Sequence, residues 1–458
     1  AEKGNVEEMN KVIECCTSGM GVFQNGGKAS ELFEKTLEWR DPLIVCKIAY
    51  LYECGKGVPQ DLEKALDWYL KAANFGYVQA MCKVAEHYEN GTGVPKNIAK
   101  AFEWRVKAAE QGISKDMHKV VEYCMNGTGA FQDDSKSSKL FERALNWKDP
   151  ILNCKIGYLY ELGKGVPKNF NKAFEWYLRA ANFGDMSAMH KVAEYHEKGL
   201  GVAQNFEKAF EWFNKAAENG SINAMFNLGV FYENGRGVPQ NFNKALEWYL
   251  KAAEREYIDA AYKVIEYYEE GTKVPQDFVK ALDWYKKLVR IAYPGGQKME
   301  DAIYKMTRYY EEGTKVPKNL EEAFKWYKYL AEYGNARAMV SIGDCYMFNR
   351  GVDFCYKDVL KWYSKAASNG SAEAMYKLAE IYELGLNLMV PIDKDKACKW
   401  YLESAANGDV KAMCKVAEYY ENGTGIPKDI EKAFEWHVKA AEKGNVEEMN
   451  KVIECCTS

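Results

Sequence analysis

The sequence lacks the long apolar runs and the one-signed charge that mark membrane proteins and nucleic-acid-binding proteins. No stretch approaches the roughly 18–20 apolar residues that a membrane helix needs, so we expect no membrane insertion. The 62 Lys and Arg residues are balanced by 66 Asp and Glu residues, for a formal net charge of −4. Because nucleic-acid binding depends on a basic field, this balance argues against nucleic acid as the main partner.

Metal-ligand spacing is also missing from the 13 cysteines and 5 histidines. There is no CxxC and no HExxH, so we predict neither a metal site nor a cofactor. Unpaired thiols favour a cytosolic protein, since disulfides persist mainly in oxidising compartments. Five Asn-Gly-Thr or Asn-Gly-Ser turns would be glycosylation acceptors in a secreted protein, so a secreted or surface location stays open.

No arrangement of residues typical of a catalytic site is present. His190 and His196 lie six residues apart, which places them on nearly opposite faces of one helix. The loop Gly91-Thr-Gly-Val follows an expected helix and recurs in most repeats, whereas a phosphate-binding loop follows a strand. We therefore predict that the protein is not an enzyme.

What the sequence does contain is one unit, represented by residues 81–109, repeated from end to end. Equivalent residues, which we call anchors, recur at a spacing of 36 in ten of twelve intervals. The anchors are Met9, Val45, Met81, Met117, Asn153, Met189, Met225, Ala261, Ile303, Met339, Met375, Met413 and Met449. The two longer intervals, of 42 and 38 residues, place their extra residues in expected connections, where insertions are tolerated.

Each unit carries the signals of two helices joined by a tight turn. In the representative copy, Met81, Val84 and Tyr88 form an apolar stripe with helical spacing. Glycines and a proline at 91–95 then end the helix, and Asn97 is an expected N-cap for the second helix. The pattern predicts an all-α protein, an α-solenoid superhelix of about twelve antiparallel helix pairs.

The repeated pattern AM-x2-V-A/G-E-x-Y-x2-G-x-G-V-P-x-D/N-x2-K-A-x2-W-Y-x-K-A-A-x2-G resembles the Sel-one-like repeat family. The resemblance covers essentially the whole chain. It implies a curved superhelix of antiparallel helix pairs, related to tetratricopeptide repeats, and a role in protein interaction. Some cysteine-rich bacterial members hold each repeat with a disulfide near its Ala-Ala segment, and those cysteines are absent here.

Two longer periodicities overlie the 36-residue unit. Residues 9–116 resemble residues 117–224, which predicts two related three-repeat blocks. Residues 1–18 are identical to residues 441–458, at an offset of 440 that equals the distance from the first anchor to the last. We interpret residues 1–458 as a single continuous repeat solenoid, part of a longer solenoid or a head-to-tail filament of copies of itself.

The predicted function is a non-enzymatic scaffold for protein partners. The alternative to self-assembly is a discrete adaptor that binds a partner peptide or protein in its concave groove. The candidate binding residues form a column on the first helices, six positions after the anchors, because exposed aromatic residues are frequent binding anchors. This column comprises His87, Tyr123, Tyr195, Phe231, Tyr267, Tyr309 and Tyr419.

Overall fold

The computed structural model describes residues 6–18, 26–129, 134–144, 147–386 and 389–444. In these ranges the secondary structure is α-helical, apart from 3-10 segments at Thr36–Trp39 and Trp147 and an isolated bridge between Leu386 and Val390. The first helices of the units are α1 (Val6–Thr17), α3 (Pro42–Cys54), α5 (Val78–Asn90), α7 (Ser114–Met125), α9 (Pro150–Leu162), α11 (Met186–Lys198), α13 (Ile222–Asn234), α15 (Ile258–Glu270), α17 (Gln297–Glu312), α19 (Ala336–Met347), α21 (Ala372–Leu384) and α23 (Val410–Asn422). The second helices are α2 (Gly26–Lys35), α4 (Leu62–Asn74), α6 (Ile98–Glu110), α8 (Asp134–Ala144), α10 (Phe170–Asn182), α12 (Phe206–Glu218), α14 (Phe242–Ala253), α16 (Phe278–Ile291), α18 (Leu320–Glu332), α20 (Tyr356–Ser368), α22 (Lys394–Ala406) and α24 (Ile430–Glu442). The all-α prediction is therefore confirmed.

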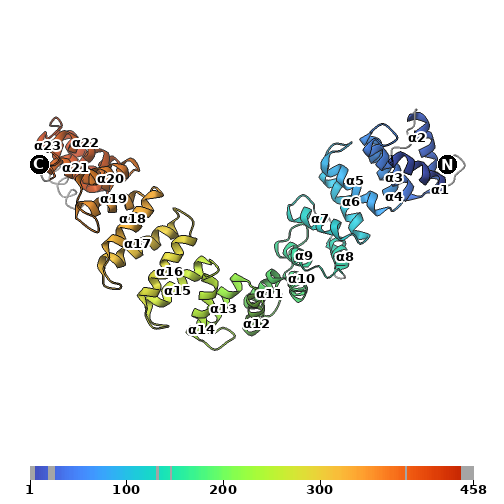
Figure 1. Cartoon of the computed structure of the whole chain (residues 1–458), viewed down its shortest axis with the longest axis horizontal. Helices are drawn as coiled ribbons and strands as arrows, with labels where there is room; N and C mark the ends of the chain where they lie inside the picture. Colours follow the sequence, from blue (N-terminus) through green and yellow to red (C-terminus); the bar gives the residue numbers. More distant parts are fainter. Residues whose placement is uncertain (1–5, 19–25, 130–133, 145–146, 387–388, 445–458) are drawn as a thin grey trace. The chain divides into compact units, whose positions relative to one another are not determined.

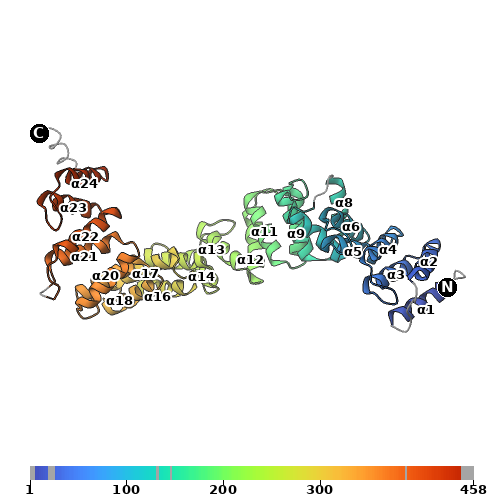
Figure 2. The ribbon, with the colours of Figure 1, turned by 90° about the horizontal axis from the view of Figure 1, so that it is seen from above.

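The chain divides into two compact units, residues 1–245 and 246–458. Within each of these two compact units, the first helix of a repeat packs against the second helix of the same repeat, as α5 packs against α6 and α17 against α18. The second helix also packs against the next first helix, and consecutive helices lie side by side in Figures 1 and 2. This is the packing of helix-pair repeats. Continuity of a single solenoid through residues 1–458, and the relation of the two three-repeat blocks, stay predictions.

Local hydrogen bonds place the start of most second helices where the sequence predicts it. The Asn97 side chain accepts from the Lys100 backbone N–H at 3.0 Å, satisfying one of the free donors of α6. The same cap is formed by Asp61, Asn169, Asn205, Asn241, Asp277, Asn319 and Asp429. The predicted caps are confirmed, and these eight second helices begin in the same register.

The two glycines of the turn have different roles. Gly91 ends α5 in the left-handed conformation, with φ at 75°. Gly93 has a φ of +67°, and a Cβ there would lie 2.3 Å from the Leu62 carbonyl oxygen in the preceding repeat. The absence of a Cβ at Gly93 thus permits backbone contact with the preceding repeat, which a side chain in this conformation would prevent.

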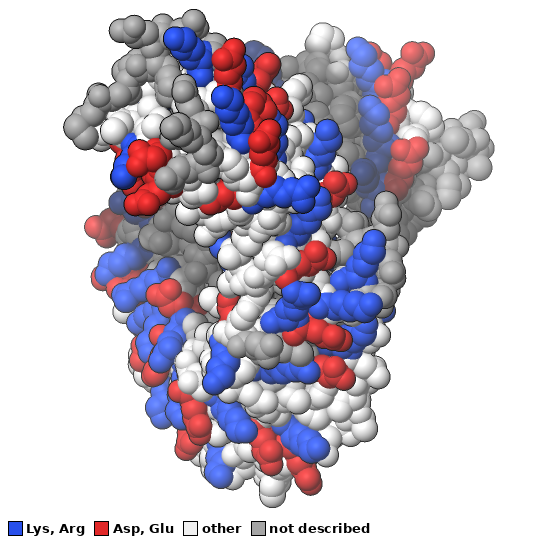
Figure 3. All heavy atoms as spheres, turned by 90° about the vertical axis from the view of Figure 1, so that its right-hand side faces the viewer, with Lys and Arg blue, Asp and Glu red and all other residues white. Residues whose placement is uncertain are grey.

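The surface of the described part of the chain is charged and mixed. On the face shown in Figure 3, Lys and Arg side chains are interspersed with Asp and Glu, and neither sign forms a continuous field. No helix in the described ranges has both the length and the apolarity that a membrane crossing requires.

Candidate functional site

The aromatic column that the sequence predicts as an exposed binding surface is mostly buried. His87, Tyr195, Phe231, Tyr267, Tyr309 and Tyr419 are each at most 4% exposed. Only Tyr123 is half-buried, and its hydroxyl donates to the Glu89 carboxylate at 2.5 Å. The expectation of exposed rings is therefore wrong for six of the seven residues.

The physical reason is packing between successive repeats. Each buried ring of the column meets the aromatic side chain of the second helix before it, as Tyr195 meets Tyr177 with 5.6 Å between ring centres. The equivalent ring pairs are Tyr69–His87, Phe213–Phe231, Tyr249–Tyr267, Tyr285–Tyr309 and Tyr401–Tyr419. Five of these contacts are edge-on and the Tyr69–His87 contact is tilted. Such contacts stabilise the interface between repeats and bury the rings in it.

A polar contact recurs beside these rings, and we call it the inter-repeat bridge. The Glu161 carboxylate, near the end of α9, accepts from the Tyr177 hydroxyl of α10 at 2.5 Å and pairs with Lys191 of α11 at 3.2 Å. Burial is the main cause of a raised pKa of Tyr177, and the hydrogen bond to Glu161 raises it further, so this hydroxyl stays protonated. Equivalent bridges, each made of a carboxylate, a tyrosine hydroxyl and a lysine, form at Glu53, Glu269, Asp344 and Glu383. Their lysine–carboxylate distances range from 3.0 to 3.8 Å.

The bridge at Asp344 shows that the interaction tolerates a change of residue. Met347 occupies the usual glutamate position in α19, and Asp344 stands one helical turn earlier. Its carboxylate still accepts from the Tyr363 hydroxyl at 2.5 Å and from Lys377 at 3.0 Å. The bridge is therefore a feature of the repeat interface rather than of one side chain.

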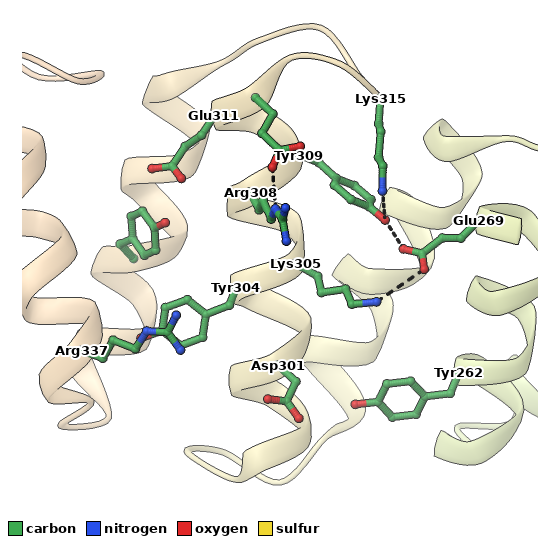
Figure 4. A pocket seen from close by; sticks show the side chains of 12 residues that line it. Tyr262, Glu269, Asp301, Tyr304, Lys305, Arg308, Tyr309, Glu311, Lys315 and Arg337 are labelled. Carbon is green, nitrogen blue, oxygen red and sulfur yellow. Dashed lines mark hydrogen bonds and ion pairs between the residues drawn. The ribbon is translucent and has the colours of Figure 1, made fainter. Parts of the chain in front are cut away.

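A groove of about 840 Å³ lies in the compact unit formed by residues 246–458, around the first helix α17 (Figure 4). A smaller hollow of about 390 Å³ adjoins it along α15 and shares Tyr262, Glu269, Asp301 and Lys305 with it. The groove is lined by Tyr262, Glu269, Asp301, Tyr304, Lys305, Arg308, Tyr309, Glu311, Glu312, Lys315, Tyr327 and Arg337. Four basic and four acidic side chains lie among four tyrosines, so the lining is polar, aromatic and balanced in formal charge.

The groove forms where the repeat departs from its usual pattern. The interval between Ala261 and Ile303 is the 42-residue one, and part of its extra length extends α17 to 16 residues, against 13 in α5. The expectation that the insertion lies only in a connection is thus incomplete. Lys315 replaces the second glycine of its turn, and its Nζ lies 4.4 Å from the centre of the Tyr309 ring. The long interval and this lysine are the signals that could have located the groove.

Most charged groups in the groove already have partners within it. Lys305 pairs with Glu269 at 3.6 Å, Arg308 pairs with Glu312, and the Tyr309 hydroxyl donates to Glu269. The Arg337 guanidinium lies over the Tyr304 ring, 4.3 Å from its centre. In the described ranges no group of three or more His, Cys, Asp or Glu side chains could hold a metal ion. The lining therefore suits recognition of a polar, partly aromatic surface.

Comparison with known proteins identifies the family. The Sel1 repeat family model matches residues 45–77, 78–113, 122–146, 152–185, 187–221, 222–257, 258–290, 300–335, 336–371, 372–409 and 410–445. The chain belongs to the Sel1 repeat family. Sel1 repeat proteins generally act as protein-interaction scaffolds, and their members are typically non-catalytic.

Solved structures of other Sel1 repeat proteins are similar to this chain. A protective antigen of uropathogenic Escherichia coli, with an SLR fold, is 28% identical over 92% of this chain and 89% of that one, with a TM-score of 0.42. A Sel1 repeat protein of Oxalobacter formigenes is 24% identical over 73% of this chain and 93% of that one, with a TM-score of 0.48. No curated protein sequence matches the chain significantly.

Proposed function

We propose that this Sel1 repeat chain is a non-enzymatic scaffold that holds an extended segment of a partner protein in the groove around α17. The observation that carries the proposal is the groove itself, with four tyrosines and eight charged side chains on one face. Tyrosine and arginine are enriched among the residues that dominate protein–protein affinity. An extended segment offers backbone amides and alternating side chains, which suit a lining with both signs of charge.

The aromatic column contributes to this proposal indirectly. Tyr309 is the one column residue that lines the groove, and its ring is 3% exposed. Its hydroxyl donates to Glu269 and lies 3.4 Å from the Lys315 ammonium. We assign Tyr309 the role of positioning these two charged groups, which then face the partner.

Blocking the groove tests the proposal. Arg308 has a side chain 75% exposed on α17, and Glu122 occupies the equivalent position of α7 in the first unit with a side chain 55% exposed. Nine-residue peptides selected by display on the full chain are measured by fluorescence anisotropy. We expect Arg308→Trp to weaken binding by at least about tenfold, since the indole fills the space of the peptide. Glu122→Trp, the matched control, should bind as the wild type does.

Two results contradict the groove as the binding site. One is equal weakening by Arg308→Trp and Glu122→Trp, which would place the peptides elsewhere. The other is failure to select any peptide on the full chain. Circular dichroism of both variants confirms that the helices are intact, because neither side chain contributes to the buried core.

A second candidate function is head-to-tail association of copies. It rests on the identity between residues 1–18 and 441–458. In α1 this sequence buries Met9, Ile13 and Cys16, and the helix packs against α3. The segment 446–457 lies outside the described residues, but it carries the same apolar stripe. Electron microscopy at several protein concentrations tests the idea, and short, monodisperse particles at every concentration would overturn it.

A further inference from the structure

The groove contains one carboxylate that departs from the inter-repeat bridges. Glu311 stands eight residues after its anchor Ile303, the position held by Glu161 and Glu269 in their own repeats. Tyr327 of α18 stands at the position of the bridge tyrosines Tyr177 and Tyr285, and it lines the groove together with Glu311. Two of the groups of a bridge, the carboxylate and the tyrosine, are therefore in place.

The groups that the next repeat should supply are missing. Ser341 stands where the other bridges have a lysine, and its hydroxyl donates to the Arg337 carbonyl oxygen of its own helix at 3.2 Å. Cys345 stands where the column has its aromatic residue, and it is 3% exposed. No ion pair to Glu311 forms in the described part of the chain, and Figure 4 shows its carboxylate without a bonded cation.

Nearby cations are directed to other groups. Lys305 pairs with Glu269 on the other side of α17 in Figure 4, and Arg308 pairs with Glu312. Burial raises the pKa of Glu311 despite the opposing hydrogen bond from Tyr327 and the more distant charge of Arg350. The raised pKa indicates that the negative charge of this carboxylate is not fully compensated by its surroundings.

We propose that Glu311 and Tyr327 form a cation subsite in the groove, which receives a lysine or arginine side chain of the bound partner segment. The incoming cation takes the place that a lysine at position 341 would fill, and completes between two proteins the bridge that other repeats form within the chain. The ring of Tyr304, which already stacks with Arg337, lines the same groove and offers an aromatic surface beside the subsite. This inference rests on the proposed function, because it names the chemistry of the segment that the groove would hold.

Three pools of fluorescein-labelled nine-residue peptides test the subsite on the full chain. The pools have the same randomised flanks and differ only in a central Lys, Ala or Glu. We expect the Lys pool to bind about tenfold more tightly than the Ala pool, the preference that a charge-assisted hydrogen bond supplies. Glu311→Gln should remove this preference. Glu312→Gln, a neutralisation of the adjacent carboxylate that faces Arg308, should retain it.

A gain-of-lysine variant provides an independent arm. In Ser341→Lys the new ammonium can occupy the subsite from within the chain, as Lys305 does at Glu269. We expect this variant to lose the preference for the Lys pool while keeping the Glu311 carboxylate. Thermal unfolding of all three variants shows whether any loss reflects unfolding, and a variant that keeps the wild-type transition isolates the effect on binding.

The outcomes separate the subsite from the groove. Equal binding of the three pools, with loss of all binding in Arg308→Trp, would overturn the cation subsite and leave the proposed groove intact. Preference for the Glu pool would also overturn it, and would assign the groove to an acidic segment. An unchanged Lys preference in Glu311→Gln would contradict the role of this carboxylate. Absence of binding by any pool would count against both the subsite and the groove.

Discussion

The Arg105 guanidinium of α6 donates to the Asp116 carboxylate of α7 at 2.6 Å, and both side chains are at most 3% exposed. Arg105 stands where most second helices have the bridge tyrosine, and Asp116 stands where most first helices have alanine. Arg105 also donates to Glu89, so it takes over the role of the tyrosine at the inter-repeat bridge. The two exceptional residues therefore compensate for each other across one repeat interface.

This pair predicts a strongly non-additive mutant cycle. Arg105→Tyr alone leaves Asp116 buried without its cation, which should cost about 3–5 kcal/mol of local stability. The double variant Arg105→Tyr/Asp116→Ala restores the pattern of the other repeats, and should lie within about 1 kcal/mol of the wild type or exceed it. Hydrogen exchange of amides in α6 and α7 measures both changes. Additive losses from Arg105→Tyr and Asp116→Ala would contradict the compensation.

The same interface predicts a dependence of stability on pH. Burial opposes ionisation of Glu89, but hydrogen bonds from Arg105 and Tyr123 hold its pKa below the usual value. A depressed folded-state pKa contributes stability that is present above the unfolded-state pKa, about 4.3, and is lost as the pH falls through the folded-state value. The destabilisation caused by Glu89→Gln should therefore be large at pH 7 and much smaller at about pH 3. Hydrogen exchange or denaturant titration at the two pH values tests this, and an equal loss at both would contradict it.

The two kinds of turn glycine predict different costs of substitution. At Gly93 a methyl group meets the Leu62 carbonyl oxygen, and the residue has a φ of +67°. Gly112 has a φ of +92°, but nothing lies within 4 Å of an added Cβ. Gly112→Ala should cost only the backbone strain, about 1–2 kcal/mol. Gly93→Ala adds a clash between repeats, for a total of roughly 3 kcal/mol or more. Equal costs in hydrogen exchange of the flanking helices would show that the repeat contact adapts freely.

Cysteine reactivity should follow burial. Cys46 and Cys124 are free thiols, and burial raises the pKa of Cys46 to about 11 and that of Cys124 to about 12. Because the thiolate is the reactive form, both should resist alkylation in the folded chain. Cys15 and Cys54 are exposed and should react with iodoacetamide before Cys46 and Cys124. Peptide mass spectrometry after timed alkylation, with and without guanidinium chloride, measures the order. Folded-state labelling of Cys124 as fast as that of Cys54 would refute the assignment.

Features set by neighbouring residues in the chain could be predicted correctly. The Asn97 cap bonds an amide three residues away, and Gly91 ends its helix through a conformation that other residues adopt with strain. These determinants are local, so the helix limits follow from short sequence windows. The aromatic column was predicted on the correct helices but with the wrong exposure. Helical spacing assigns a side chain to a face, whereas the ring that covers Tyr195 comes from Tyr177 on another helix.

The sequence by itself determined the helix-pair repeat, the number of its copies and the membership of the chain in a repeat family. This is because each copy contains the apolar period, the cap residue and the turn residues that specify the helix pair. Only the tertiary structure decided which polar groups meet across repeats. Lys191, which pairs with Glu161, lies 30 residues later in the chain. Ser341 occupies the corresponding position for Glu311, and the absence of a lysine there matters only because α17 and α19 belong to adjacent repeats. The candidate site therefore depends on contacts between repeats, where the physical environment of each charge is set by folding rather than by its neighbours in sequence.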